Sequence, residues 1–216
     1  MFFKRTFEDI KAVKDRDPAA RNWLEIFLLY PGVKAIRMHR RANFFYRHKM
    51  FFIARYISQK AVRLTGIEIH PGATIGRRLV IDHGTGVVIG ETTEIGDDVL
   101  IYQGVTLGGT GKEVGKRHPT IGNNVMISSG AKVLGPFKVG DNARIASGAV
   151  VLEEVPEGAT VVGVPARVVR LNGEKVTPLD QVHIPDPIMQ EINRLENEID
   201  KLNLEIQTLK HAKEGK

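Results

Sequence analysis

Apolar residues divide the chain into regions with different spacings. Up to about residue 65 they recur three and four positions apart, a spacing that predicts helices, as at Trp23, Ile26, Phe27 and Tyr30. Asp17-Pro18 fits a helix N-cap followed by proline at the first helical position, and Pro31-Gly32 is expected to end that helix. We therefore predict an N-terminal helical domain over residues 1–65.

The middle region has a period of six. An aliphatic residue recurs every six positions from Ile69, shifts phase by two residues between Val87 and Ile89, and resumes after an interruption at Ile121, Ile127, Val133, Val139, Ile145 and Val151. Neither an α-helix nor a single alternating strand repeats every six residues. Short strands that turn every six residues do, because three of them close one triangular coil around the aliphatic side chains. Residues 66–170 are therefore predicted to form a parallel β-helix.

The interruption, residues 108–120, is polar and rich in glycine (GGTGKEVGKRHPT). This composition does not fit the wall of a coil, so we expect the segment to loop out of the β-helix. Loops held by a rigid scaffold commonly carry functional residues.

The last region has a heptad pattern. After a proline-containing linker at residues 171–187, apolar residues alternate spacings of four and three at Ile188, Ile192, Leu195, Ile199, Leu202, Ile206 and Leu209. This seam predicts a coiled-coil helix over residues 188–212, the alternative being a single amphipathic helix packed on its own domain. Ile at the a positions with Leu at the d positions favours two strands, whereas β-helix domains of this type associate as trimers, and we expect the trimer.

Composition excludes several classes of protein. The chain has 216 residues and no cysteine, so disulfides, thiolate metal sites and a cysteine nucleophile are excluded. No segment approaches the roughly 20 apolar residues of a membrane helix, and we expect no signal peptide, no membrane association and a cytoplasmic setting. The net charge is +6, and residues 26–67 lack Asp and Glu. The charged residues of this segment are therefore all basic. A solvated basic helix face explains the segment better than a nucleic-acid surface, which stays a minor alternative.

Histidine is the leading candidate for a general base near neutral pH. Of the seven histidines, His70, His83 and His118 fall in the six-residue repeats or their loop. Glu68 precedes His83 by about one coil, so it could hold the imidazole from the neighbouring coil, as a carboxylate does when histidine deprotonates a hydroxyl. A corner-packing histidine is the alternative. The three histidines lack the close pair typical of zinc sites on this scaffold, so no metal is expected.

Five motifs occur together in an order that resembles the serine acetyltransferase family. They are Arg16-Asp17-Pro18-Ala19, Asp82-His83-Gly84-Thr85-Gly86 with Ile89-Gly90-Glu91-Thr92, Gln103 to Lys112 (QGVTLGGTGK), Arg117-His118-Pro119, and Gly163-Val164-Pro165-Ala166-Arg167. The likeness covers roughly residues 16–170. The repeats and the last motif belong to many acyltransferases, whereas the DHGTG, GGTGK and RHP set is much narrower. The resemblance implies a left-handed parallel β-helix that transfers an acetyl group from acetyl-CoA to L-serine, without a metal.

The resemblance also implies roles in binding serine. His83 would take the proton from serine Oγ with Glu68 as its partner, although most members of the family have Asp at the Glu68 position. Asp17 and Asp82 would bind the ammonium group, and Asp17 could also be a helix cap. Arg117 and His118 would bind the carboxylate, for which the bidentate guanidinium is suited.

A second set of residues would serve acetyl-CoA. The resemblance implies that the amide of Gly109 stabilises the oxyanion, that Arg144 meets a CoA phosphate, and that the pantetheine groove between subunits is lined by Thr110, Ser129 and Ser147.

The resemblance has consequences for partners as well. The family is inhibited by cysteine, which competes for the serine pocket. The short helical domain lacks the helices that join trimers into hexamers, which favours a homotrimer. The chain ends in Gly215-Lys216, not in the isoleucine that docks into cysteine synthase, so we do not expect that complex. The rival functions are acetyl transfer to a sugar or antibiotic hydroxyl and a non-catalytic trimeric scaffold.

Overall fold

The computed structural model describes residues 2–111, 114–171, 194–195, 197–199 and 201–202. The chain forms two compact units, Met1–His183 and Ile184–Lys216. In the second unit the described residues are helical, and Leu195, Ile199 and Leu202 are exposed. The rest of the predicted coiled coil at 188–212, and the linker after residue 171, lie outside the described residues.

Four helices open the first unit: α1 (Phe2–Arg16), α2 (Trp23–Leu29), α3 (Pro31–Arg47) and α4 (Phe51–Thr65). The predicted cap at Asp17 is wrong. Helix α2 begins after Asn22, whose side chain accepts a hydrogen bond from the Glu25 amide, while Asp17 lies in the preceding turn and accepts one from the Ala19 amide. Pro31 follows the end of α2 and is also the first residue of α3, where a missing amide hydrogen costs nothing.

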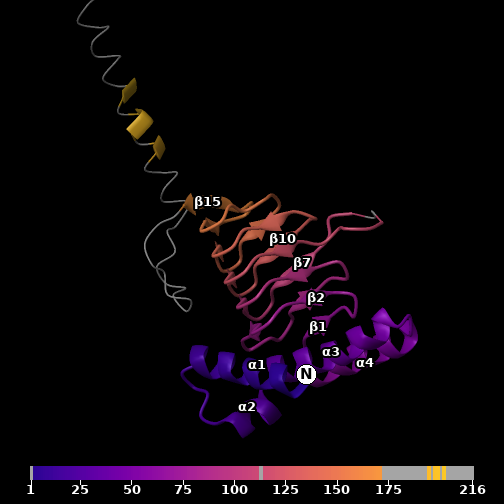
Figure 1. Ribbon diagram of the computed structural model, residues 1–216. Helices are drawn as coiled ribbons and strands as arrows, with labels where there is room; N and C mark the ends of the chain where they lie inside the picture. The colour runs from indigo at the N-terminus through magenta and orange to yellow at the C-terminus, as the bar shows by residue number, and fades with distance from the viewer. Residues whose placement is uncertain (1, 112–113, 172–193, 196, 200, 203–216) are drawn as a thin grey trace, which may run out of the picture. The chain divides into compact units, whose positions relative to one another are not determined.

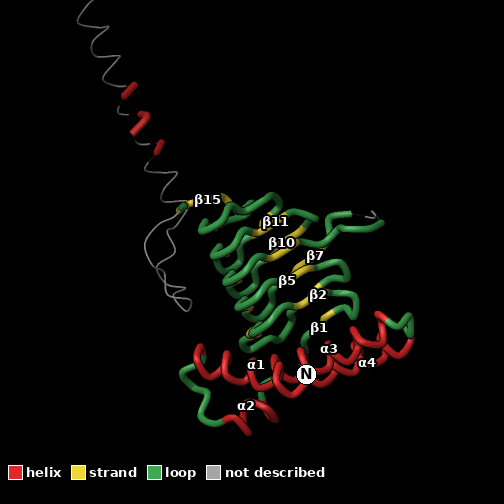
Figure 2. The backbone as a smooth tube through the Cα atoms, in the orientation of Figure 1, coloured by secondary structure: helices red, strands yellow, loops and turns green. Residues whose placement is uncertain are grey.

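The other described residues of the first unit form a left-handed parallel β-helix with three sheets. Sheet A contains β1 (Glu68–Ile69), β4 (Val88–Ile89), β7 (Thr106–Gly108), β10 (Lys132–Leu134) and β13 (Val150–Val151). Sheet B contains β2 (Thr74–Ile75), β5 (Glu94–Ile95), β8 (Thr120–Ile121) and β11 (Lys138–Val139). Sheet C contains β3 (Val80–Ile81), β6 (Leu100–Ile101), β9 (Met126–Ile127), β12 (Arg144–Ile145), β14 (Thr160–Val162) and β15 (Arg167–Arg170). Strand pairs are parallel throughout these sheets except β14 with β15, which is antiparallel. Figure 2 shows the short strands joined by turns at the corners of the coils.

Three edges separate the sheets, and the site depends on them. Edge AB, where the chain passes from sheet A to sheet B, comprises residues 70–73, 90–93, 109–119 and 135–137. Edge BC comprises residues 76–79, 96–99, 122–125 and 140–143, and edge CA comprises residues 82–87, 102–105, 128–131 and 146–149.

The six-residue aliphatic pattern marks the interior of the coils, as predicted. Its members from Ile69 to Val151 are buried, apart from the partly exposed Ile75. Val87 is buried too, but it stands at edge CA beside the strand and not within it. The phase shift read from the sequence is therefore an enlargement of one corner, residues 82–87.

The helices lie at one end of the coils and β15 at the other (Figure 1). Outward residues of sheet C share one core with the helices, formed by Ile10, Ala12, Val13, Ile26, Val33, Val80, Leu100, Tyr102 and Met126. Helix α3 runs beneath the first coil: its Gly32 meets the Ile81 carbonyl so closely that no Cβ fits there, and its Asn43 side chain donates to the Pro71 carbonyl at 2.8 Å. One helix therefore touches both the end of β3, next to edge CA, and edge AB.

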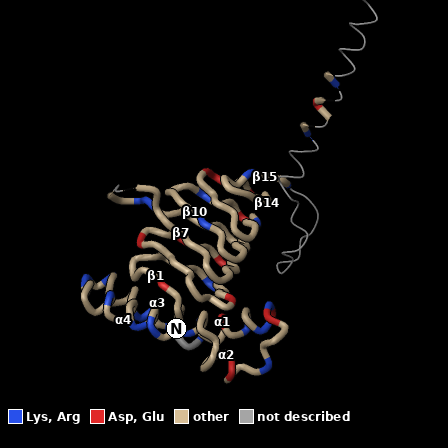
Figure 3. Tube along the Cα trace, turned by 180° about the vertical axis from the view of Figure 1, so that it is seen from behind, with Lys and Arg blue, Asp and Glu red and all other residues tan. Residues whose placement is uncertain are grey.

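The basic helical residues are partly used within the protein. Lys and Arg follow the helices in Figure 3. Arg40 donates to both oxygens of the buried Asp9, Arg37 lies over the Phe27 ring, and Arg55 lies 3.7 Å from Glu68. Among the described helices none is long and apolar enough to span a membrane.

Candidate active site

His83 occupies the enlarged corner on edge CA. Six residues, 82–87, connect β3 to β4, whereas four, 102–105, make the same connection one coil later. His83 has a φ of 56°, in the left-handed region, and the Gly84 amide donates to the Asp82 carbonyl at 2.6 Å. Strand pairing is unaffected, since Glu68 still faces Val88. The two extra residues thus present an exposed imidazole without disturbing the coil, and a non-glycine residue with positive φ is a feature that clusters at functional sites.

Two carboxylates, Asp17 and Asp82, influence the Tyr30 hydroxyl. The Tyr30 hydroxyl donates to Asp17 Oδ2 at 2.8 Å, while Asp17 Oδ1 accepts from the Ala19 amide at the same distance. Burial raises the pKa of Tyr30 to about 12, with contributions from the Asp17 hydrogen bond and from the charge of Asp82. Asp82 therefore lies next to His83 on edge CA, and Asp17 lies in the turn after α1, where it holds the Tyr30 hydroxyl.

Glu68 lies on the neighbouring coil, in the first strand of sheet A. Its amide donates to the Val87 carbonyl at 2.9 Å, so its backbone is next to the His83 corner. Its carboxylate faces Arg55, and no hydrogen bond joins it to His83 in the described part of the chain. The orienting contact between Glu68 and His83 remains a prediction.

Arg117 and His118 lie on a different edge, AB. Arg117 donates to Glu91 Oε2 at 2.5 Å. The His118 ring is buried against Gly90, where a Cβ would overlap the ring, and its Nδ1 accepts from the Thr92 amide at 3.2 Å. Burial, followed by the charge of Arg117, lowers the pKa of His118. The neutral imidazole is therefore favoured.

The two groups of predicted serine ligands are far apart on one chain. Helix α3 meets Ile81, the last residue of β3 before edge CA, with Gly32, and it reaches edge AB with Tyr46, whose hydroxyl donates to Glu91 at 2.8 Å. Gly32 and Tyr46 are 14 positions apart, which is roughly 20 Å at the rise of an α-helix. A free amino acid is far shorter than this separation, because one residue spans only about 3.8 Å of chain. A single chain therefore does not bring Asp17, Asp82 and Arg117 around one serine.

The residues predicted for CoA are also divided. Ser129 and Ser147 lie on edge CA with their hydroxyl oxygens 3.2 Å apart, beside a column of glycines that includes Gly104 and Gly130. Gly109 lies on edge AB, where its Cβ position is 2.9 Å from the Arg117 carbonyl. Thr110 follows Gly109 on the same edge.

Arg144 lies apart from both groups. Its guanidinium donates to the carbonyls of Asn124, Asn142 and Ala143 on edge BC, at 2.6 to 3.3 Å. Burial lowers its pKa.

Sequence reasoning missed Tyr30, Tyr46 and Glu91. Glu91 belongs to a motif quoted above but received no role, and counting coils would have placed it on edge AB with Arg117. Nothing in the helical spacing of the tyrosines distinguishes them from core residues. A pocket of about 440 Å³ adjoins Glu91 and Tyr46. No group of three or more His, Cys, Asp or Glu side chains suited to hold a metal occurs within the described ranges.

Family models match both parts of the first unit. "Serine acetyltransferase, N-terminal" matches residues 2–38, and "Bacterial transferase hexapeptide (six repeats)" matches residues 118–153. A curated serine acetyltransferase of Bacillus pumilus is 55% identical over 99% of each chain, and that of Bacillus subtilis is 54% identical over 97% of each chain.

Solved structures agree with these relatives. A serine acetyltransferase in complex with cysteine has a TM-score of 0.82 at 42% identity and covers 85% of this chain and 72% of its own. The soybean enzyme with serine scores 0.76 at 42% identity, and a complex with CoA scores 0.73 at 42%, each covering 78% of this chain and 69% of its own. The full-length identity, the helical domain and the six-residue coils together show that this chain belongs to the serine acetyltransferase family.

Proposed function

We propose that this chain transfers the acetyl group of acetyl-CoA to the hydroxyl of L-serine, giving O-acetyl-L-serine and CoA. The observation that carries the proposal is the enlarged corner that presents an exposed His83 next to Asp82, in a chain 55% identical to a serine acetyltransferase over 99% of its length.

His83 acts as the base in this proposal. It accepts the proton of serine Oγ as that oxygen attacks the thioester carbonyl, and later returns it to the departing CoA thiolate. Asp17 and Asp82 hold the ammonium group of serine, and Glu68 stabilises the imidazolium after leaving Arg55. The amide of Gly109 donates to the oxyanion of the tetrahedral intermediate, an effect typically worth about 3 kcal/mol.

A homotrimer completes the site. Since edges CA and AB are roughly 20 Å apart on one chain, the serine carboxylate is bound by Arg117 and His118 of a neighbouring copy, which faces edge CA with its edge AB. Ser129, Ser147 and the glycine column then form one wall of the CoA groove, with Gly109 and Thr110 on the opposite wall.

Cysteine occupies the same pocket in this proposal. A solved relative is a complex with cysteine, and cysteine differs from serine only in having a thiol in place of the hydroxyl. Inhibition by cysteine is therefore competitive with serine.

A thiol-release assay tests the function. Purified chain is incubated with acetyl-CoA and either L-serine or a panel of sugars and hydroxylated antibiotics, and free CoA is measured. We expect turnover with L-serine at least tenfold faster than with any other acceptor. Faster turnover with a sugar would reject serine as the substrate, and no turnover with any acceptor would favour the scaffold.

A further inference from the structure

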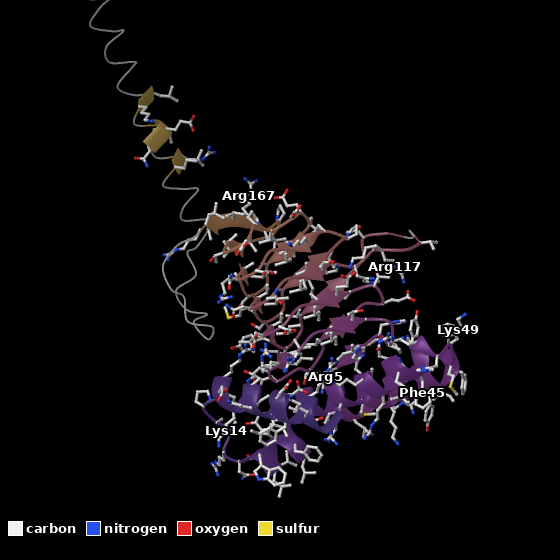
Figure 4. All side chains as sticks on the ribbon, in the orientation of Figure 1. Arg5, Lys14, Phe45, Lys49, Arg117 and Arg167 are labelled. Atoms are coloured by element: carbon white, nitrogen blue, oxygen red, sulfur yellow. The ribbon has the colours of Figure 1, made fainter. Side chains whose placement is uncertain are left out.

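Arg117 lies near the C-terminal end of a long loop that is held by contacts with the preceding coil. The loop between β7 and β8 has eleven residues, 109–119, against four at the same edge in the two preceding coils. It is tied down at its C-terminal end, where the Arg117 amide donates to Thr92 Oγ1 at 3.1 Å and Lys116 donates to the Thr92 carbonyl at 2.8 Å. Figure 4 shows Arg117 on the side of the coils that lies above the Phe45–Lys49 end of the helices.

Glu91 is the partner that holds the Arg117 side chain. One guanidinium nitrogen donates to Glu91 Oε2, and the structure gives this side chain no other hydrogen bond among the described residues. Guanidinium carries five N–H donors in a rigid fork, so most of them stay free for another carboxylate.

Tyr46, from helix α3, holds Glu91 in turn. Its hydroxyl donates to Glu91 Oε1 at 2.8 Å, so each carboxylate oxygen has one donor. The hydrogen bond from Tyr46, followed by that from Arg117, lowers the pKa of Glu91, and the bond to Glu91 raises the pKa of Tyr46. Glu91 is thus a carboxylate with a fixed orientation near neutral pH.

We propose that Tyr46 and Glu91 are positioning residues that hold the Arg117 guanidinium ready for the carboxylate of the acceptor amino acid. The proposal rests on the function proposed above. It assigns the helical domain a part in recognising the acceptor, because the chain of contacts runs from α3 through Glu91 to Arg117 and does not involve His83.

Glu91→Gln is the first test. The variant keeps the shape of the side chain but loses the charge that orients Arg117. We expect the KM for L-serine to rise about 10-fold to 100-fold, the range for losing a charge-assisted hydrogen bond, with the KM for acetyl-CoA within twofold of wild type. An unchanged KM for serine, or equal increases in both constants, would overturn the proposal.

L-Serinamide, which lacks the carboxylate, separates positioning from a general structural effect. Wild-type protein should prefer serine over serinamide in kcat/KM, and Glu91→Gln should reduce that preference at least tenfold. A variant that loses activity equally towards both acceptors would contradict a role through Arg117.

Tyr46→Phe provides a second, milder variant. It keeps the ring and its edge contacts with Phe51 and His70 and removes only the hydroxyl. The KM for serine should rise about 3-fold to 10-fold, as expected for one neutral donor. No change in that constant for a folded Tyr46→Phe protein would remove Tyr46 from the proposal.

Glu94→Gln is the matched control. Glu94 lies in the same pocket and pairs with the neighbouring loop residue Lys116 at 3.0 Å, but it does not contact Arg117. Its KM for serine should stay within twofold of wild type, and an increase as large as that of Glu91→Gln would indicate loop anchoring in place of positioning. Wild-type protein that fails to acetylate serine rejects the proposed function itself, whereas wild-type activity with unaffected variants rejects only this inference.

Discussion

Edges BC and CA of the β-helix have related turns but use their polar groups differently. On edge BC three side chains accept hydrogen bonds from the backbone of an adjacent coil: the backbone amide of Arg77 donates to Asp97, that of Asp97 to Asn123, and that of Asn123 to Asp141, at 2.7 to 2.8 Å. The left-handed corner positions on this edge include Asp98, Asn124 and Asn142.

Edge CA has glycine at the corresponding left-handed positions, including Gly86, Gly104, Gly130 and Gly148. At Gly130 and Gly148 the space that a Cβ would occupy is open, with no neighbouring atom within 4 Å. The Ser129 hydroxyl donates to Ser147 Oγ, neither hydroxyl has another hydrogen bond within the described part of the chain, and His83 is exposed. Edge BC uses its turn side chains to join neighbouring coils, whereas edge CA presents the exposed His83 and the Ser129–Ser147 pair. Under the function proposed above, one edge stabilises the coil and the other serves chemistry.

The largest expected effect comes from His83→Asn. Asn tolerates a positive φ and cannot act as a base at neutral pH. We expect kcat to fall about 100-fold or more, with the free energy of unfolding within about 0.5 kcal/mol of wild type. Steady-state assays and urea unfolding measure the two quantities. A rate within twofold of wild type would refute the role of edge CA in catalysis.

Asn123→Ala should have the opposite profile. The substitution removes the side-chain oxygen that accepts from the Asp97 backbone amide and the side-chain nitrogen that donates to Asp141. We therefore expect the free energy of unfolding to fall by about 1 kcal/mol while kcat is unchanged. Urea unfolding monitored by circular dichroism checks the first value and the thiol-release assay the second. A large fall in kcat without a change in stability would contradict the division between the edges.

The smallest effect concerns pH. Hydrogen bonds from the Asn123 amide and side chain lower the pKa of Asp141 below its ordinary value of 3.8. The stabilisation from a lowered carboxyl pKa is complete above that value and is lost as the pH falls through the folded pKa. The thermal midpoint of wild type should therefore drop more steeply below about pH 4 than that of Asp141→Asn. Parallel curves for the two proteins would show that Asp141 contributes nothing to this edge.

The sequence predicts the coil well because burial imposes its period directly. Each aliphatic residue of the six-residue series from Ile121 to Val151 is buried inside a coil. The period can therefore be read from the sequence without knowledge of tertiary contacts. The corner at His83 was visible only as a phase shift. Helix boundaries were less predictable, because Asn22 and Asp17 are both good caps and only the path of the chain decides between them.

The candidate site was predicted residue by residue but not in space. Asp82 and Arg117 were assigned to one amino acid, yet they lie on different edges, and the position of Arg117 depends on how the eleven-residue loop returns to its coil. Tyr46 gave no signal, because its hydroxyl acts through a partner 45 positions away. Contacts of this range depend on the packing of α3 against the coils, which local patterns do not encode.

The corner of six residues at 82–87 and the loop 109–119 share one property: both add length where the chain turns, and neither alters the pairing of Glu68 with Val88 or of Glu94 with Thr120. Insertions at these turns are thereby uncoupled from the hydrogen-bonded ladder. Residues at a corner can therefore be inserted, deleted or exchanged while the coils keep their register. This architecture can thus accommodate different acceptor specificities without a change of fold.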